Sequence, residues 1–80
     1  MTIGKAVRER ITDLCNENGI TINKLSTISG ITQSTLNNII SGRNNSATVS
    51  TIQKICDGLG ITITEFFTSD LFDNIEQELK

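Results

Sequence analysis

The sequence predicts an all-α fold made of five or six short helices. Apolar residues recur at intervals of three and four along most of the 80-residue chain, which is the spacing of helices with one buried face. Glycine follows several of these apolar stretches, where helices commonly end. The chain contains no proline, and no segment is predicted to be a strand. One small helical domain is therefore expected.

The first helix is predicted from about residue 4 to residue 18, because five apolar residues share one of its faces. These residues are Ile3, Val7, Ile11, Leu14 and Cys15. Gly19 follows them and suits a left-handed C-terminal cap.

A second and a third helix follow, separated by a sharp turn. Thr21 can cap the second helix, in which Leu25 and Ile28 are expected to face inward. Gly30 supplies the positive φ that a tight reversal favours, and Thr32 can cap the third helix. Two short helices joined in this way form the plan of a helix-turn-helix, whose second helix lies in a DNA major groove.

The third helix is expected to end just before Gly42 and to carry a polar outer face. With Leu36 and Ile39 buried, a rotation of about 100° per residue turns several amide side chains outward. The residues predicted to contact bases are Gln33, Ser34, Asn37 and Asn38. Asn and Gln match the N6/N7 edge of adenine, and no Arg on this face can bind guanine, so A·T pairs are expected at the contacted positions. The alternative is that these side chains only solvate an exposed helix.

Phosphate contacts are expected to surround this helix. Free backbone N–H groups at a helix start bind anions, which makes the starts at Thr21 and Thr32 candidates. Arg43, Asn44 and Asn45 follow the third helix and are predicted to contact the adjacent DNA backbone; a solvated loop would explain the two asparagines equally well. The remaining nearby cations are interpreted as ordinary surface charges: Lys5, Arg8 and Lys24.

Two further helices are predicted. The fourth begins at residue 48 or 49 and is ended by Gly58 and Gly60. Its apolar face comprises Val49, Ile52, Ile55, Cys56 and Leu59. A capping box over residues 62–65 begins a short fifth helix.

The chain is predicted to divide into a helical domain, residues 1–68, and an acidic amphipathic tail, residues 69–80, interpreted as a sixth helix. Apolar residues expected at an interface with a second copy are Phe67, Leu71, Phe72 and Ile75, with packing inside the chain as the alternative. The formal net charge of −2 is uneven. Residues 1–60 hold six basic and four acidic residues, whereas residues 61–80 hold five acids and one lysine. The acidic excess thus lies outside the segment expected to face DNA.

The composition argues against an enzyme or a metalloprotein. The chain has no His, the commonest general base and metal ligand. Cys15 and Cys56 are not in a CxxC arrangement, and we expect them to be reduced core residues of a cytoplasmic protein. No cofactor or metal is expected. The N-terminus lacks the apolar run of a signal peptide, and no segment approaches the roughly 20 apolar residues that cross a membrane.

This pattern of residues resembles the helix-turn-helix domain of Cro and phage repressors, also called XRE-type regulators. The segments that carry the resemblance are ITDLCNENGIT, KLSTISGITQSTLNNIISGR and TIQKICDGLGITITEFF. The resemblance implies a five-helix lambda-repressor-like domain with a short C-terminal extension, usually dimeric operator binding, and transcriptional control. It also implies that Gln33, Ser34 and Asn38 occupy base-contacting positions, with Asn37 adjacent, and that Thr21 and Arg43 occupy phosphate-contacting ones.

We therefore expect a sequence-specific DNA-binding transcription regulator. The leading hypothesis is a repressor that binds an inverted-repeat operator as a homodimer through the helix at about residues 32–41. Its partner would be double-stranded DNA, and the protein would be cytoplasmic and bacterial or phage-encoded. The alternative is an antitoxin or other protein-interaction module, in which the acidic tail binds a partner protein and DNA binding is secondary.

Overall fold

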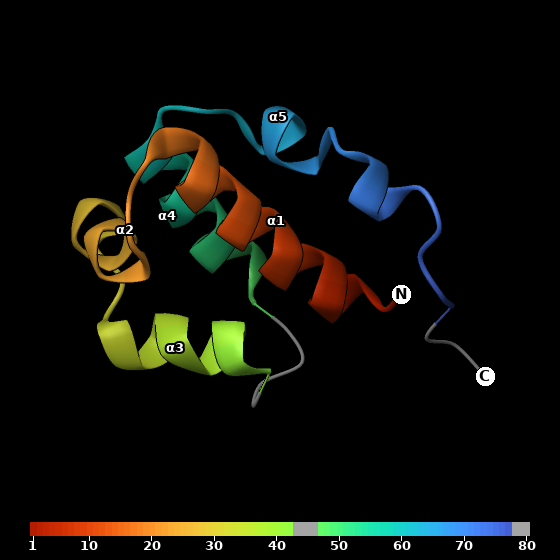
Figure 1. The fold of residues 1–80 in the computed structure, drawn as a ribbon, viewed down its shortest axis with the longest axis horizontal. Helices are drawn as coiled ribbons and strands as arrows, with labels where there is room; N and C mark the ends of the chain where they lie inside the picture. The colour runs from red at the N-terminus through yellow and green to blue at the C-terminus, as the bar shows by residue number, and fades with distance from the viewer. Residues whose placement is uncertain (43–46, 78–80) are drawn as a thin grey trace.

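The computed structural model describes residues 1–42 and 47–77, and their helices pack around one core (Figure 1). The elements are α1 (Ile3–Asn18), α2 (Ile22–Ser29), α3 (Gln33–Ser41), α4 (Val49–Leu59), α5 (Ile63–Phe67) and the 3-10 helix η1 (Asp70–Phe72). The described residues contain no strand. The all-α prediction is confirmed, and the first three helices lie close to the predicted boundaries.

Each α-helix begins after a threonine that caps it. In every case the threonine hydroxyl accepts a hydrogen bond from the backbone N–H three residues later, at 3.0 to 3.2 Å. The five caps are Thr2, Thr21, Thr32, Thr48 and Thr62. At α5 the Glu65 carboxylate also accepts from the Thr62 N–H at 3.0 Å, which confirms the predicted capping box. Such a cap stabilises a helix by about 1 kcal/mol, so local sequence fixes where these short helices begin.

The core takes at least one fully buried apolar side chain from every α-helix. These side chains, which have no exposed surface, include Ile11, Leu25, Leu36, Ile55 and Phe66. Burying one side chain of this size contributes roughly 1.5–3 kcal/mol. Cys15 and Cys56 lie in the same core and are not joined to each other, which confirms their prediction as core residues; their reduced state stays a prediction.

Arg10 fastens α5 onto α1. Its Nε donates to the Phe66 carbonyl at 2.6 Å, and its Nη2 donates to the Glu65 carbonyl at 2.9 Å. Carbonyls near a helix C-terminus carry partial negative charge and attract a guanidinium; the Glu65 carbonyl also accepts from the Thr68 N–H at 3.2 Å. This contact holds the short α5 in place while the Phe66 ring fills the core.

The packing of α2 against α4 differs from the prediction. Ile28 was expected to face inward, but it is 37% exposed, and the buried residues of α2 are Leu25, Ser26 and Ser29. The cause is Gly58, which lies inside α4 rather than at its end. A Cβ at position 58 would stand 2.9 Å from the Ile28 carbonyl oxygen and 2.7 Å from the Ser29 hydroxyl oxygen. At this separation only small side chains fit between the helices, and the larger Ile28 points outward.

Val49 also departs from its expected place on the buried face of α4. It is 73% exposed, because it is the first residue of α4 and lies ahead of the part of the helix that meets the core. The buried residues of this helix are Ile52, Ile55 and Cys56, all of which belong to the predicted apolar face.

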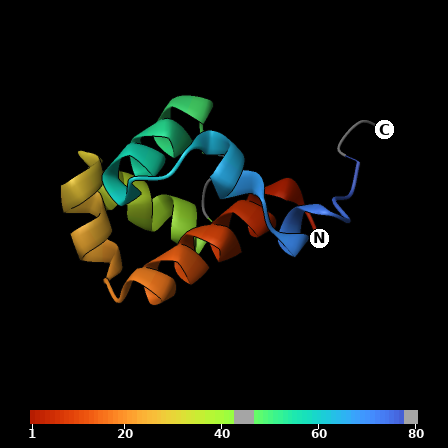
Figure 2. The same cartoon turned by 90° about the horizontal axis from the view of Figure 1, so that it is seen from above.

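The prediction of a sixth helix over residues 69–80 is wrong for the residues described. Only η1 is helical there, residues 73–77 are not, and residues 78–80 lie outside the described part. The Glu76 N–H donates to the Met1 carbonyl at 3.0 Å, so this backbone group pairs with the N-terminus instead of a preceding turn. Figure 2 shows η1 beside the N-terminal end of α1. A non-local contact therefore replaces the helical hydrogen bonds that amphipathic spacing predicted.

Candidate nucleic-acid interface

The turn between α2 and α3 is built around Gly30. Gly30 has φ +69°, a conformation that costs a side-chain-bearing residue energy and costs glycine little. The Ile31 N–H donates back to the Ser26 carbonyl at 3.1 Å, which closes the end of α2. Ile31 is then buried in the core, and Thr32 begins α3. These contacts fix the angle at which α3 leaves the turn.

One face of α3 is anchored and the other is open. Leu36 is fully buried and Ile39 nearly so. Of the predicted base-contacting residues, Gln33, Ser34 and Asn37 are exposed, and Asn38 is half-buried. Figure 1 shows α3 along one border of the molecule, with α1, α2 and α4 on its inner side. The helix thus presents amide and hydroxyl groups outward from a rigid support.

The two threonines predicted to contact phosphates are exposed, but their hydroxyls already act within the protein. The Thr21 hydroxyl accepts from the Lys24 N–H at 3.1 Å. The Thr32 hydroxyl accepts from the Thr35 N–H at 3.2 Å and donates to the Thr35 hydroxyl at 2.9 Å. An anion at either helix start would therefore meet the remaining free N–H groups of the first turn. Arg43, Asn44 and Asn45 lie outside the described residues.

Comparison with known proteins agrees with this geometry. The family model for the Cro/C1-type helix-turn-helix DNA-binding domain matches residues 10–70. The chain belongs to this family. The crystal structure of prophage Lp1 protein 11 superposes with a TM-score of 0.82 and 35% sequence identity, covering 94% of this chain and 99% of the other. None of the curated proteins is significantly similar to the chain.

Membership of the Cro/C1-type family confirms the resemblance seen in the sequence. The match spans α2, the Gly30 turn and α3, so this unit is the helix-turn-helix of a DNA-binding domain. The expected fold is confirmed as well, with five α-helices in residues 1–42 and 47–77. The roles of individual side chains in DNA contact stay predictions.

The residues predicted for a dimer interface lie together at the end of the chain. Phe67, Leu71, Phe72 and Ile75 are all half-buried. The Phe67 ring packs edge-on against both Phe66 and Phe72, with centroids 4.9 Å apart in each pair. Part of the apolar surface of these aromatic residues is therefore already used within the Cro/C1-type domain, and their contact with a second copy stays a prediction.

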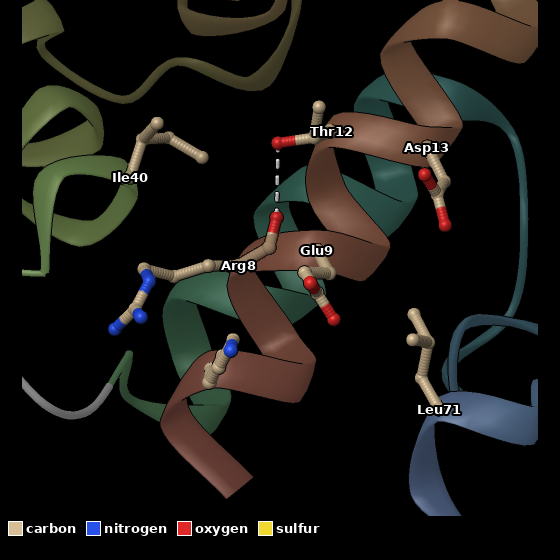
Figure 3. Close-up of a pocket in the computed structure, with 7 residues that line it drawn as sticks. Arg8, Glu9, Thr12, Asp13, Ile40 and Leu71 are labelled. Carbon is tan, nitrogen blue, oxygen red and sulfur yellow. Dashed lines mark hydrogen bonds between the residues drawn. The ribbon is translucent and has the colours of Figure 1, made fainter. Parts of the chain in front are cut away.

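A shallow groove of about 550 Å³ runs between α1, α3 and η1 (Figure 3). Its lining carries charges of both signs: Lys5 and Arg8 are basic, whereas Glu9 and Asp13 are acidic. Arg8 extends toward the side of α3, and Asp13 lies on the side of Leu71. In the described part of the chain, no group of three His, Cys, Asp or Glu side chains is placed to hold a metal ion, and no helix is long and apolar enough to cross a bilayer.

Arg8 is the residue whose position the sequence did not reveal. Its guanidinium lies against Gly42, the residue that ends α3: a Cβ built at Gly42 would be 3.2 Å from Nη1 and 3.4 Å from Cζ. Gly42 has φ +80°, so both its backbone conformation and the arginine beside it favour the absence of a side chain. Residues 8 and 42 are far apart in the sequence, and no local pattern indicates their contact.

Proposed function

We propose that this Cro/C1-type domain is a sequence-specific transcription repressor that binds an inverted-repeat operator as a homodimer, with α3 in the major groove. The observation that carries the proposal is the outer face of α3, where Gln33, Ser34 and Asn37 are exposed above a buried Leu36. Residues near the start of a recognition helix contact base edges in this docking geometry. The alternative is that these side chains only solvate an exposed helix. That alternative gives no reason for them to follow a capped helix and a tight turn, which is the arrangement of a helix-turn-helix.

The chemistry of this face favours A·T pairs. A Gln or Asn amide offers one donor and one acceptor, which match the N6 and N7 groups of adenine. Asn38 lies closer to the protein than its neighbours, being half-buried, so its contacts would depend most on how deeply α3 enters the groove. Each good bidentate pair contributes roughly 1–3 kcal/mol of discrimination.

Two copies would supply the affinity that one small domain lacks. The whole chain carries a net charge of −2, so non-specific attraction to phosphates is modest. A symmetric dimer doubles the base contacts and requires half-sites about one helical turn apart. The half-buried Leu71 and Ile75, with Phe67 and Phe72, are the proposed interface.

Selection of bound fragments from a random DNA library tests the proposal. An enriched inverted repeat is expected, together with loss of preference in the Gln33→Ala/Asn37→Ala variant. Asn16→Ala serves as the matched control, because Asn16 is an exposed amide on α1, outside the helix-turn-helix. Sedimentation at the concentrations used for binding should show a dimer, and Ile75→Asp should shift it to monomer.

Two results would contradict the proposal. One is binding without sequence preference that disappears at moderate salt. The other is an unchanged preference in the Gln33→Ala/Asn37→Ala variant. The first result, accompanied by tight binding of a protein through the acidic tail, residues 69–80, would instead support the protein-interaction module.

A further inference from the structure

We infer that Arg8, on α1, is a DNA phosphate-binding residue, which extends the nucleic-acid interface beyond the helix-turn-helix. The inference rests on the proposed placement of α3 in the major groove. Its starting point is the contact between the Arg8 guanidinium and Gly42 at the end of α3. This contact places a positive charge from the first helix at the C-terminal end of the recognition helix.

The position of that charge matches the edge of a DNA groove. An α-helix rises 1.5 Å per residue, so the nine residues of α3 span roughly 13 Å. The major groove is about 12 Å wide and is bordered on both sides by phosphates. When the first turn of α3 contacts base edges, its C-terminal end stands near one phosphate strand. Arg8 lies at that end.

The protein holds Arg8 in this place before DNA arrives. The side chain is half-buried and lies against the end of α3, where the helix dipole is negative and attracts a cation. In Figure 3 the Arg8 guanidinium extends toward the side of α3, whereas the Glu9 carboxylate lies in front of α1 and Asp13 lies on the side of Leu71; all three residues line the same groove. A pre-ordered guanidinium binds phosphate with less loss of side-chain entropy than a free one, and its planar donors suit phosphate oxygens.

A purely structural role for Arg8 makes a different prediction. If the guanidinium only neutralised the end of α3, its loss would lower thermal stability and leave the ionic component of DNA binding unchanged. A phosphate contact releases a counterion from DNA, so its loss lowers the slope of log affinity against log salt by about 0.9. A slope lower by 0.9 means that, if the variant and the wild type bind equally at 1 M salt, the variant binds roughly fivefold more weakly at 0.15 M salt. The salt slope therefore separates the two roles.

The test compares Arg8→Gln with Lys54→Gln across a salt series, using fluorescence anisotropy and both an operator duplex and a non-specific duplex. Lys54 is exposed on α4, so its variant loses the same charge without losing a group at the end of α3. We expect the slope to fall by about one for Arg8→Gln only, equally on both duplexes. Arg8→Lys should retain most of the slope. Circular dichroism should show both Gln variants folded.

Equal slopes for the two Gln variants would overturn the inference, and so would a changed melting temperature with an unchanged slope in Arg8→Gln. Failure of the proposed function looks different, since the wild type itself would then not distinguish the two duplexes. In that case the slopes on non-specific DNA still decide whether Arg8 contacts phosphate.

Discussion

Gly58→Ala tests the close packing of α2 on α4, which supports the helix-turn-helix. The added Cβ would stand 2.7 Å from the Ser29 hydroxyl oxygen and 2.9 Å from the Ile28 carbonyl oxygen, both well inside van der Waals contact. Overpacking of this kind costs about 1–3 kcal/mol, whereas Ala in place of Gly gains at most about 1 kcal/mol of helix propensity. Because one of the clashing atoms is a backbone carbonyl oxygen, which cannot move aside as a side chain can, the cost should lie in the upper part of this range, and we expect a net loss of about 1–2 kcal/mol in the free energy of unfolding.

Urea unfolding followed by circular dichroism measures this loss as a lower midpoint at unchanged slope. Ser29→Ala is the companion variant. Within the described residues the Ser29 hydroxyl is buried without a hydrogen-bond partner, and removing such a group should stabilise the fold by about 1 kcal/mol. The double variant should stay less stable than Ser29→Ala alone, since the Ile28 carbonyl still meets the new Cβ. A Gly58→Ala protein as stable as the wild type would refute this account of the packing.

Two other predictions concern α5 and the cysteines. Arg10→Met removes both hydrogen bonds to the Glu65 and Phe66 carbonyls and should lower the melting temperature. A fully buried hydrogen bond to a charged group contributes about 1.5–3 kcal/mol, and each bond of this partly exposed pair should contribute less. An unchanged melting temperature would contradict the role of Arg10 in holding α5 against α1. Burial raises the pKa of the Cys15 and Cys56 thiols, so both should react with a thiol reagent only after unfolding, whereas rapid reaction of the native protein would place them outside the core. Because the raised pKa belongs to the folded state, the stability associated with these thiols is fully present below their ordinary pKa and is lost as the pH rises through the folded-state value.

The features that the sequence predicted are those encoded within a few neighbouring residues. Thr21, Gly30 and Thr32 act through hydrogen bonds and dihedral angles that span at most one helical turn, and each was found in its expected role. The outer face of α3 could be predicted for the same reason, because one rotation per residue places Gln33 and Asn37 once the buried side is known.

The features that the sequence missed depend on contacts between distant residues. Ile28 points outward because Gly58 brings another helix close to its backbone, and helical periodicity alone cannot distinguish a small buried side chain from an exposed large one. The tail forms no sixth helix as far as residue 77, since Glu76 bonds to Met1. Arg8 reaches the end of α3 through the packing of α1 on α3, which no spacing within α1 reveals.

The proposed recognition of bases by α3 is best tested with a specificity profile. Affinities of the wild type and Gln33→Ala are measured for every single-base-pair variant of the selected operator. If α3 contacts base edges, the variant loses about 1–3 kcal/mol of discrimination at one A·T pair in each half-site and keeps its preferences elsewhere. Uniform weakening across all the duplexes, with the profile unchanged, would contradict the claim that this face of α3 contacts base edges.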